Sequence, residues 1–321
     1  MKTIIDWRVM PYDCFIPTKE KRTDKLLVTT SQCVLGVMIL LITVASIVYH
    51  NSLSFVNWHN IRINCFPVDR RKESFVLKSR QTLSKLLNFS FLNYTNKTHS
   101  CGEKDLPALY CKTEVYPDFL ALYSEPGLYH KTDRTGVCFY QFDSFFDGKR
   151  GLYEAIYHDD TVRLAYFKKR FEGVRFFISP DYSEFGDIHV IENEYRLFKA
   201  RVVAIWFIVE IGAVVIPNVS FPTKKSAAYA LDGYEECSVV AISTKSHLQD
   251  KVEYERLLWK IRFTVDHLKL KAIVVYDACG TNDRVMECFA YAISKGIEII
   301  IPDNTLKTRN AANRKAVSRN G

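Results

Sequence analysis

The chain has 321 residues, of which 48% are hydrophobic and 25% are charged, an ordinary globular composition that excludes wholesale disorder. This length can hold one large domain or two modest ones, and at least one of them can bury a full core. The formal net charge is +8, but residues 306–321 contribute +5 because they contain five basic residues and no acid. The other 305 residues carry only +3, which argues against a large nucleic-acid-binding face on the folded body.

Nine cysteines are scattered along the chain, and none forms a CxxC pair or has the spacing of a zinc site. An odd number of widely spaced cysteines is typical of reduced thiols that pack as small apolar residues. A disulfide between Cys101 and Cys111 is the alternative if this region lies outside the cell.

The first marked feature along the chain is a run of 24 uncharged residues, 26–49. As a helix that rises about 1.5 Å per residue, the run is long enough to cross a hydrocarbon layer of about 30 Å. Its centre shows no polar face at helical spacing, unlike a helix of a soluble core. We therefore predict one transmembrane helix here, after an N-terminal segment, 1–25. A cleaved signal peptide and a buried soluble helix are the alternatives.

The charges beside the predicted span indicate its orientation. Residues 1–25 contain six basic residues, whereas Arg62 is the only Lys or Arg in 50–69. The positive-inside rule therefore places the N-terminus in the cytoplasm and the large domain outside. A second basic cluster, between Arg70 and Arg80, weakens this asymmetry. We predict a single-pass membrane protein and leave open the side on which its large domain lies.

A second hydrophobic run, 202–217, contains Glu210 in its middle and is divided by Gly212. A glycine after the last helical turn is a common helix stop. We interpret this run as a buried helix that ends at Gly212 and is followed directly by a strand. The predicted number of membrane spans is therefore one.

Residues 50–114 show no sustained hydrophobic period and are interpreted as a linker region of low regularity, whereas 115–305 are regular. In the regular range, short β-branched and aromatic runs alternate with amphipathic stretches, which is typical of βαβ units and a parallel sheet. The predicted strands are 137–142, 174–179, 213–218, 238–243, 272–276 and 297–301. The predicted helices are 152–169, 191–211, 224–231, 251–268 and 283–294.

The predicted fold class is thus α/β, with a parallel sheet of about six strands built from βα units. Three glycines, Gly173, Gly212 and Gly296, stand where a helix ends just ahead of a strand, which supports the alternation. Six strands are fewer than a closed eight-stranded barrel needs. An open three-layer sheet and an incomplete (β/α) barrel are both compatible with the pattern.

A polar residue follows each predicted strand. In parallel α/β folds, ligands bind at the carboxyl ends of the strands, where loops and helix N-termini converge. Asp181 and Asp277 are the candidate catalytic residues and the candidate metal ligands. Carboxylates that meet in one cleft can act as acid and base, or can hold a hard cation such as Mg²⁺. The further ligand-binding candidates at this edge are Asp143, Asn218, Ser243 and Asp303.

Each of these positions also has a purely structural interpretation. Asp, Asn and Ser cap helices and close βα turns, so they are expected after strands without any chemistry. The sequence lacks the GxGxxG, GxxxxGK[ST], HExxH and GxSxG motifs. His247 and His267 are most simply exposed helix-edge residues. Aromatic pairs such as Phe145–Phe146 are interpreted as strand core and not as base-stacking platforms.

Several stretches resemble a known family: SPDYS at 179–183, VIPNV at 215–219, CSVVAIST at 237–244 and VVYDACG at 274–280. Over about residues 115–305, the chain is similar to a bacterial and phage family that is catalogued only as a domain of unknown function, found on phages, plasmids and other mobile elements. The matching recurring positions are Asp181, Ser183, Pro217, Asn218, Asp232 and Gly233. The resemblance implies an α/β domain and a mobile-element setting, but no activity. Family members commonly lack a spanning helix, which favours a cytoplasmic domain.

Two functions are compatible with these features. The favoured one is a membrane-anchored binding module of a mobile element, whose basic, disordered tail, 306–321, contacts nucleic acid or anionic lipid. The contact residues would be Lys307, Arg309, Arg314, Lys315 and Arg319. The alternative is a metal-dependent hydrolase or nuclease with a carboxylate site at the strand ends. The sequence names neither a substrate nor an oligomeric state.

Overall fold

The computed structural model of the protein describes residues 89–279 and 282–320, all of which belong to one compact unit, Ser74–Gly321. The predicted N-terminal segment and transmembrane helix, together 1–49, lie outside the described residues. Among the helices that are described, none is long and apolar enough to cross a membrane. The membrane span therefore stays a prediction from the sequence.

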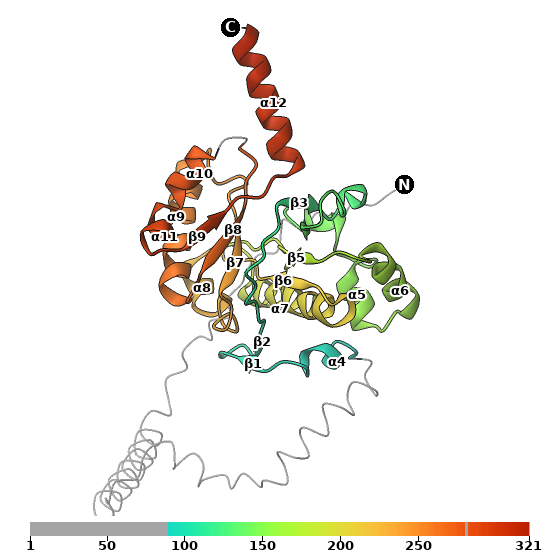
Figure 1. Ribbon diagram of the computed structural model, residues 1–321. Helices are drawn as coiled ribbons and strands as arrows, with labels where there is room; N and C mark the ends of the chain where they lie inside the picture. The colour runs from blue at the N-terminus through green and yellow to red at the C-terminus, as the bar shows by residue number, and fades with distance from the viewer. Residues whose placement is uncertain (1–88, 280–281, 321) are drawn as a thin grey trace, which may run out of the picture. The chain divides into compact units, whose positions relative to one another are not determined.

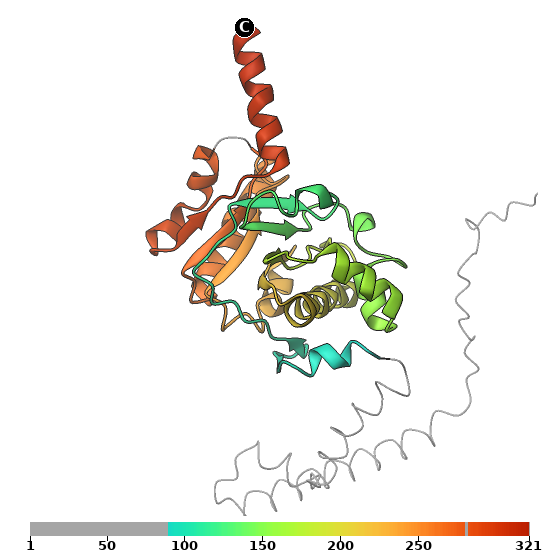
Figure 2. The same ribbon diagram turned by 45° about the vertical axis from the view of Figure 1, so that its right-hand side comes forward.

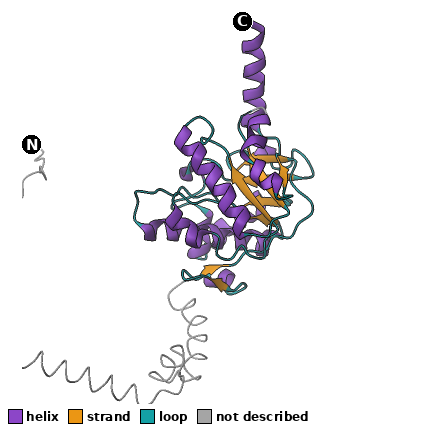
Figure 3. Cartoon of the chain, turned by 90° about the vertical axis from the view of Figure 1, so that its left-hand side faces the viewer, coloured by secondary structure: helices purple, strands orange, loops and turns teal. Residues whose placement is uncertain are grey.

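The strands of the main domain lie in two parallel sheets, drawn in orange in Figure 3. The first sheet has the order β3 (Phe119–Leu122), β4 (Thr135–Cys138), β5 (Phe176–Ile178) and β6 (Val214–Ile216). The second has the order β7 (Val239–Ser243), β8 (Ala272–Tyr276) and β9 (Glu298–Ile300). Each strand pairs with its neighbour in the chain, so the strand order never reverses as it does in a doubly wound sheet. The predicted parallel α/β class is confirmed.

The two sheets are joined at both of their edges. After β6, Asn218 forms a parallel bridge with Ala241 of β7, and after β9, Asp303 bridges Phe119 of β3. Each junction is held by two backbone hydrogen bonds of 2.7 to 2.9 Å. The seven strands thereby close into a ring. Of the two predicted architectures, the structure has the incomplete (β/α) barrel and not the open three-layer sheet.

Helices follow the strands and lie outside the ring (Figures 1 and 2). Those beside the first sheet are α5 (Leu152–Tyr157), α6 (Thr161–Arg170) and α7 (Val190–Trp206), and the last of them continues in a π-helical turn, η3 (Phe207–Ile211). Those that follow β6 to β9 are α8 (Lys224–Ala230), α9 (Lys251–His267), α10 (Asp283–Cys288), α11 (Ala290–Ser294) and α12 (Thr305–Asn320). Two short 3-10 helices, η1 (Pro126–Leu128) and η2 (Asp143–Phe145), follow β3 and β4.

Local chemistry explains where the predicted helices end or divide. The hydrophobic run before β6 is a helix that ends at Gly212, whose φ of 72° is left-handed, as predicted. The helix predicted for 152–169 is two helices, because Asp159 takes a φ of 52° and Asp160 then caps α6 by accepting from the Arg163 N–H at 3.0 Å. The helix predicted for 283–294 likewise divides into α10 and α11.

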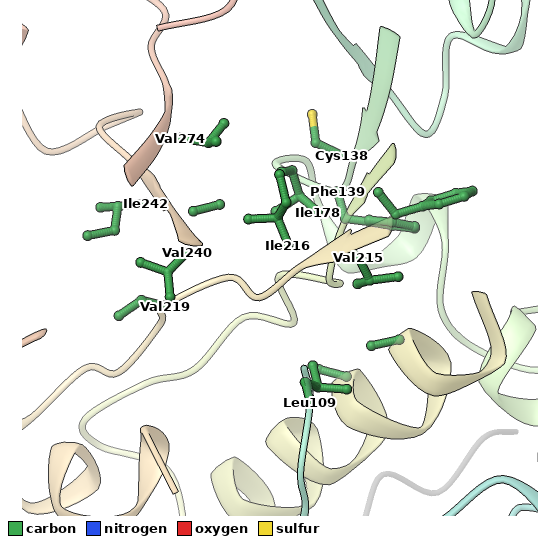
Figure 4. Packing of buried hydrophobic residues seen from close by; sticks show 14 of the residues in the cluster. Leu109, Cys138, Phe139, Ile178, Val215, Ile216, Val219, Val240, Ile242 and Val274 are labelled. Atoms are coloured by element: carbon green, nitrogen blue, oxygen red, sulfur yellow. The ribbon is translucent and has the colours of Figure 1, made fainter. Parts of the chain in front are cut away.

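Side chains alternate between the inside of the ring and the helices around it. Figure 4 shows Ile178 of β5 and Ile216 of β6 pointing into the space between the two sheets, whereas Val215 points toward α7. On the outer side, Phe177 stacks on Phe207 with a centroid separation of 3.9 Å. Because branched side chains fill its interior, the ring is a packed core and not a pore.

The segment before the barrel also belongs to the core, although the sequence assigned it to a linker region. It contains α4 (Leu92–Thr95) and an antiparallel pair, β1 (Ser100–Cys101) and β2 (Leu106–Pro107). Leu106, Leu109 and Cys111 are buried, and Figure 4 shows Leu109 beside a helix. Cys101 and Cys111 are free thiols, so the alternative of a disulfide between them does not hold here.

A fully buried arginine of α7 holds this segment in place. Arg201 donates to the carbonyl of Asp232 at 2.9 Å and to that of Ala230 at 3.1 Å, and its guanidinium lies 3.5 Å from the ring centroid of Tyr234. The backbone of Gly233, with a φ of 81°, packs directly on Ala108, where a Cβ would lie 3.0 Å from the Ala108 Cα. Asp232 and Gly233, which match recurring positions of the family, thus form part of the contact between this segment and the barrel.

Two further differences concern the ends of the domain. The strand β3 was not predicted, because its four residues are a short apolar run without alternation. The predicted disordered tail is instead the helix α12 in the described residues up to 320. Asn304 precedes this helix and its side-chain oxygen accepts from the Lys307 N–H at 2.9 Å, while Asn310 donates to the Ala278 carbonyl at 2.6 Å. These contacts fix the first turns of α12 to the barrel.

Candidate functional site

Asp143 lies in the loop after β4, at the start of η2, and joins three elements at the carboxyl end of the first sheet. Its carboxylate accepts hydrogen bonds from the Ser183 N–H at 3.1 Å and from the Ser183 hydroxyl at 2.8 Å. It also forms an ion pair of 2.7 Å with Arg196 of α7. Asp143 therefore fixes the loop after β5, which carries the SPDYS stretch, against the loop after β4.

Asp181 and Asn218, which follow β5 and β6, lie together as the sequence predicts. The Asn218 side-chain amide donates to Oδ1 of Asp181 at 2.7 Å. Asn218 is itself buried and fixed, because its Oδ1 accepts from the Tyr140 hydroxyl at 2.9 Å and its N–H donates to Oγ of Ser179 at 2.8 Å. Asp181 remains partly exposed, so a carboxylate of defined orientation faces the loops above the strands.

Three further ionisable residues complete this cluster. The sequence did not single out Glu184 and Lys260, and it interpreted His247 as an exposed helix-edge residue, whereas His247 is half-buried in a loop. Glu184 is partly buried, and its Oε2 has no hydrogen-bond partner within the described structure. Lys260 of α9 lies with its Nζ 5.6 Å from the ring centroid of Phe221, which follows β6. His247 lies in the loop between β7 and α9, and the charge of Lys260 acts on it. The cluster thus draws on loops and helices around both sheets.

Burial weakens the acidity of the two carboxyl groups in this cluster. It raises the pKa of Asp181, although the charge of Lys260 and the hydrogen bond from Asn218 oppose the shift. Burial also raises the pKa of Glu184 well above its ordinary value, and the charge of Asp181 adds to this effect. A proton is therefore held more tightly here than on an exposed carboxylate.

The two basic groups shift in the opposite direction. Burial lowers the pKa of Lys260, although Asp181 and Glu184 oppose the shift. Burial also lowers the pKa of His247, and the charge of Lys260 lowers it further. All four groups thus move toward the neutral form, which is the arrangement that proton-transfer sites use.

The protonation of the His247 ring follows from its surroundings. Nδ1 lies 2.8 Å from the Lys245 carbonyl oxygen, and because a carbonyl can only accept, Nδ1 carries the hydrogen. The intervening Ser246 has a φ of 69°, in the left-handed region that non-glycine residues rarely adopt. In the neutral ring, Nε2 is then the unprotonated nitrogen, free to accept a proton.

Asp277, the second predicted catalytic residue, has a different environment. It is 0% exposed, and its carboxylate accepts from the Thr244 hydroxyl at 2.9 Å and from the Cys279 N–H at 3.0 Å. Its carbonyl accepts from the Asn304 side chain at 2.7 Å. These contacts close the turns after β7, β8 and β9, which is a structural role. Within the described structure, no hydrogen bond joins Asp277 to Asp181.

The other two predicted ligand-binding residues also serve turns. Oγ of Ser243 accepts from the Lys245 N–H at 3.2 Å, within the turn that leads to His247. Asp303 lies at the junction of β9 with β3 and forms a long ion pair of 3.6 Å with Lys307 of α12. Ser243 is half-buried, whereas Asp303 is exposed.

The predicted metal ligands, Asp181 and Asp277, do not belong to a cluster of metal-binding side chains in the described part of the chain. Within 89–279 and 282–320, no group of three or more His, Cys, Asp and Glu side chains is placed so that it could hold a metal ion. The carboxylate of Asp181 is instead surrounded by the Asn218 amide and the charge of Lys260. These are groups that bind and orient an anion.

A small cavity lies against this cluster. Its volume is about 10 Å³, and it is lined in part by Glu184, Asn218, Ser220 and Tyr234. A space of this size holds about one water molecule, so a larger ligand would contact the exposed side of Asp181. Two hollows of about 270 and 380 Å³ lie around Gly173, at the amino ends of the strands, where barrel enzymes do not place their chemistry.

The fold and this cluster define a parallel α/β-barrel protein with a polar site at the carboxyl ends of β5 and β6. A family model described as "Domain of unknown function (DUF4417)" matches residues 98–301, which is more than half of the chain. The chain belongs to this family. Neither a search of curated proteins nor one of solved structures gave a match. Membership of a family of unknown function is thus confirmed, whereas the phage and mobile-element setting stays a prediction.

Proposed function

We propose that the protein is an enzyme that carries out general acid–base chemistry with Asp181, His247 and Lys260. One observation supports this most: acidic and basic groups from three elements influence one another electrostatically, and burial shifts each toward neutrality. Such shifts place proton donors and acceptors nearer to the working pH. The cluster lies at the strand ends at which barrel enzymes place their active sites.

The roles follow from the chemistry of each group. His247 is the base, because its Nε2 is unprotonated in the neutral ring. Asp181 is the acid, oriented by the Asn218 amide. Lys260 stabilises negative charge that develops on the substrate. The proposal thus develops the enzyme that the sequence offered as the alternative, a metal-dependent hydrolase or nuclease, but gives Asp181 a proton-transfer role in place of metal binding. Asp277 is assigned a structural role in the turns.

Competitive labelling of lysines tests the site without a known substrate. The full-length protein would be acetylated with trace amounts of acetic anhydride, and each lysine would be quantified by mass spectrometry against the unfolded chain. Lys260 should react faster than Lys251, an exposed lysine on the same helix, because a lowered pKa leaves more neutral amine. Asp181→Asn should accelerate Lys260 further. If Lys260 were the slower of the two in both proteins, the proposed site would be wrong.

Activity is tested with a panel of chromogenic esters, phosphodiesters and glycosides. Removing a general acid or base costs about a hundredfold or more in rate. Asp181→Asn and His247→Gln should therefore abolish most of any turnover that the wild type shows. Asp303→Asn, at another strand end, is the matched control and should retain it. Equal turnover in all three variants would contradict the proposed roles.

A second candidate is the binding function predicted from the sequence, and one observation favours it. The helix α12 carries five basic residues and no acid, and its first turns are fixed to the barrel. We propose that it contacts nucleic acid or anionic lipid, in a protein anchored by the predicted span at 26–49. Replacing Arg309, Lys315 and Arg319 with Gln should weaken binding and reduce its salt dependence. The same changes at Lys225, Lys251 and Lys269 are the control, and an unchanged salt slope would exclude this surface.

A further inference from the structure

Six large aromatic side chains are exposed among the described residues: three tyrosines (Tyr110, Tyr166 and Tyr195), and three phenylalanines that lie on two loops joined by the Asp143–Ser183 hydrogen bonds. Among the described residues, only three phenylalanines are exposed: Phe142 at 79%, Phe145 at 56% and Phe185 at 51%. The first two flank Asp143 in the loop after β4, and the third lies in the loop after β5. Phe145 was interpreted as strand core from the sequence, but in the structure only its neighbour Phe146 is buried.

The two loops that carry these rings are held together rigidly. Asp143, between Phe142 and Phe145, accepts from both the N–H and the hydroxyl of Ser183. Asn193 of α7 brackets Phe185, because its side chain accepts from the Phe185 N–H at 3.2 Å and donates to the Phe185 carbonyl at 2.7 Å. Rings fixed on such a scaffold lose little conformational entropy when a planar group stacks on them.

The charges beside the rings favour an anionic partner. The acids of the loop after β4 are already neutralised, because Asp143 is paired with Arg196 and Asp147 with Lys199. Lys149 and Arg150 follow in the same loop, where both are exposed and their side chains form no ion pair within the described structure. Two cations without an ion pair, in the same loop as two of the exposed rings, match the phosphates and unpaired bases of a single strand.

We propose that Phe142, Phe145 and Phe185 form a stacking surface for single-stranded nucleic acid, with Lys149 and Arg150 on its phosphates. The chain outside 306–321 carries a charge of only +3, so the rings supply most of the affinity and the salt dependence is shallow. The surface shares the loop after β5 with Asp181 and Glu184, but binding to it does not require turnover at the acid–base site.

The test measures binding of the full-length protein to fluorescein-labelled oligothymidylate and oligouridylate of about ten nucleotides by fluorescence anisotropy. Replacing each phenylalanine with alanine should weaken binding by about tenfold per ring, whichever sugar is present. The double variant Val162→Ala/Tyr166→Ala removes exposed apolar side chains of α6 and should bind as the wild type does. Circular dichroism and thermal melting check that each variant is folded.

Charge variants sharpen the same measurement. Lys149→Gln/Arg150→Gln should reduce the slope of log K against log salt by about 1.4, the value for two phosphate contacts on a single strand. Asp187→Asn, which removes an exposed acid two residues beyond Phe185, should strengthen binding. Absence of binding to either oligonucleotide, or equal affinities of the wild type and the triple phenylalanine variant, would overturn the proposal. So would a dimer of the wild type that the triple variant loses, because a second copy would then occupy the surface.

Discussion

The two sheets of the barrel end in the same kinds of residue but use them differently. At the end of the first sheet, Asp181 is partly exposed and faces the charge of Lys260. At the end of the second sheet, Asp277 is fully buried and both of its carboxylate oxygens accept hydrogen bonds from adjacent turns. An aspartate after a parallel strand is therefore not by itself a sign of chemistry. The decisive difference is whether its hydrogen-bonding capacity is already used by the fold.

The largest expected effect is a difference in the free energy of unfolding between variants of Asp277 and Asp181. Asp277→Ala should lower the free energy of unfolding by about 3 kcal/mol, because it removes a fully buried carboxylate that accepts from the Thr244 hydroxyl and the Cys279 N–H, and leaves the hydroxyl only the longer contact of 3.4 Å with the Tyr276 carbonyl. Asp181→Ala should lower the free energy of unfolding by about 1 kcal/mol, since water can take the place of a partly exposed carboxylate beside the Asn218 amide. Urea unfolding measures both values. Equal losses in the two variants would remove the distinction between the sheets.

The next effect depends on pH. Because burial raises the pKa of Glu184 in the folded state, the folded protein binds this proton more tightly than the unfolded chain does. The resulting stability is fully present below the ordinary pKa of a glutamate and is lost as the pH rises through the folded value. Glu184→Gln removes this loss, so the variant should gain stability over the wild type as the pH rises toward neutrality. A constant difference between the two proteins across this range would contradict the assigned shift.

The smallest expected effect concerns the link between the loops. Ser183→Ala removes the 2.8 Å hydrogen bond to Asp143 but keeps the one from the backbone N–H, and should cost about 1 kcal/mol of unfolding free energy. Ser243→Ala is the matched control in the second sheet, where the hydroxyl accepts only from the N–H of Lys245. If Ser243→Ala lost more unfolding free energy than Ser183→Ala, the hydrogen bonds between Ser183 and Asp143 would not distinguish the first sheet from the second.

The sequence predicts most of the strands and helices of the barrel, but it does not predict how the strands close into a ring. Each of the six predicted strands is present. The strands β4, β5, β7 and β8 are buried on both faces, as apolar runs of a parallel sheet are, whereas β6 and β9 each begin with an exposed residue. The closing strand β3 was missed because four apolar residues carry too little pattern. The ring is closed by single backbone bridges at Asn218 and Asp303. A pattern of side chains does not predict such backbone pairings.

The candidate site was predictable only in part, for a related reason. Asp181 and Asn218 could be paired because parallel strand ends share one edge. His247 and Lys260 could not be added, because the sequence places one in a loop and the other within an amphipathic helix. Glu184 directly follows the SPDYS stretch, and this position is the one local signal that could have identified it. Long-range packing, and not local pattern, brings these groups together.

The most direct test of the site is a titration of His247 by nuclear magnetic resonance. The pKa of its ring should lie below the ordinary value for histidine, with the hydrogen on Nδ1 in the neutral form. Lys260→Met should raise this pKa, because the charge of Lys260 lowers it in the wild type. Lys251→Met, an exposed change on the same helix, should leave it unchanged. An ordinary pKa for His247, or an equal response to both variants, would contradict a shared site for His247 and Lys260.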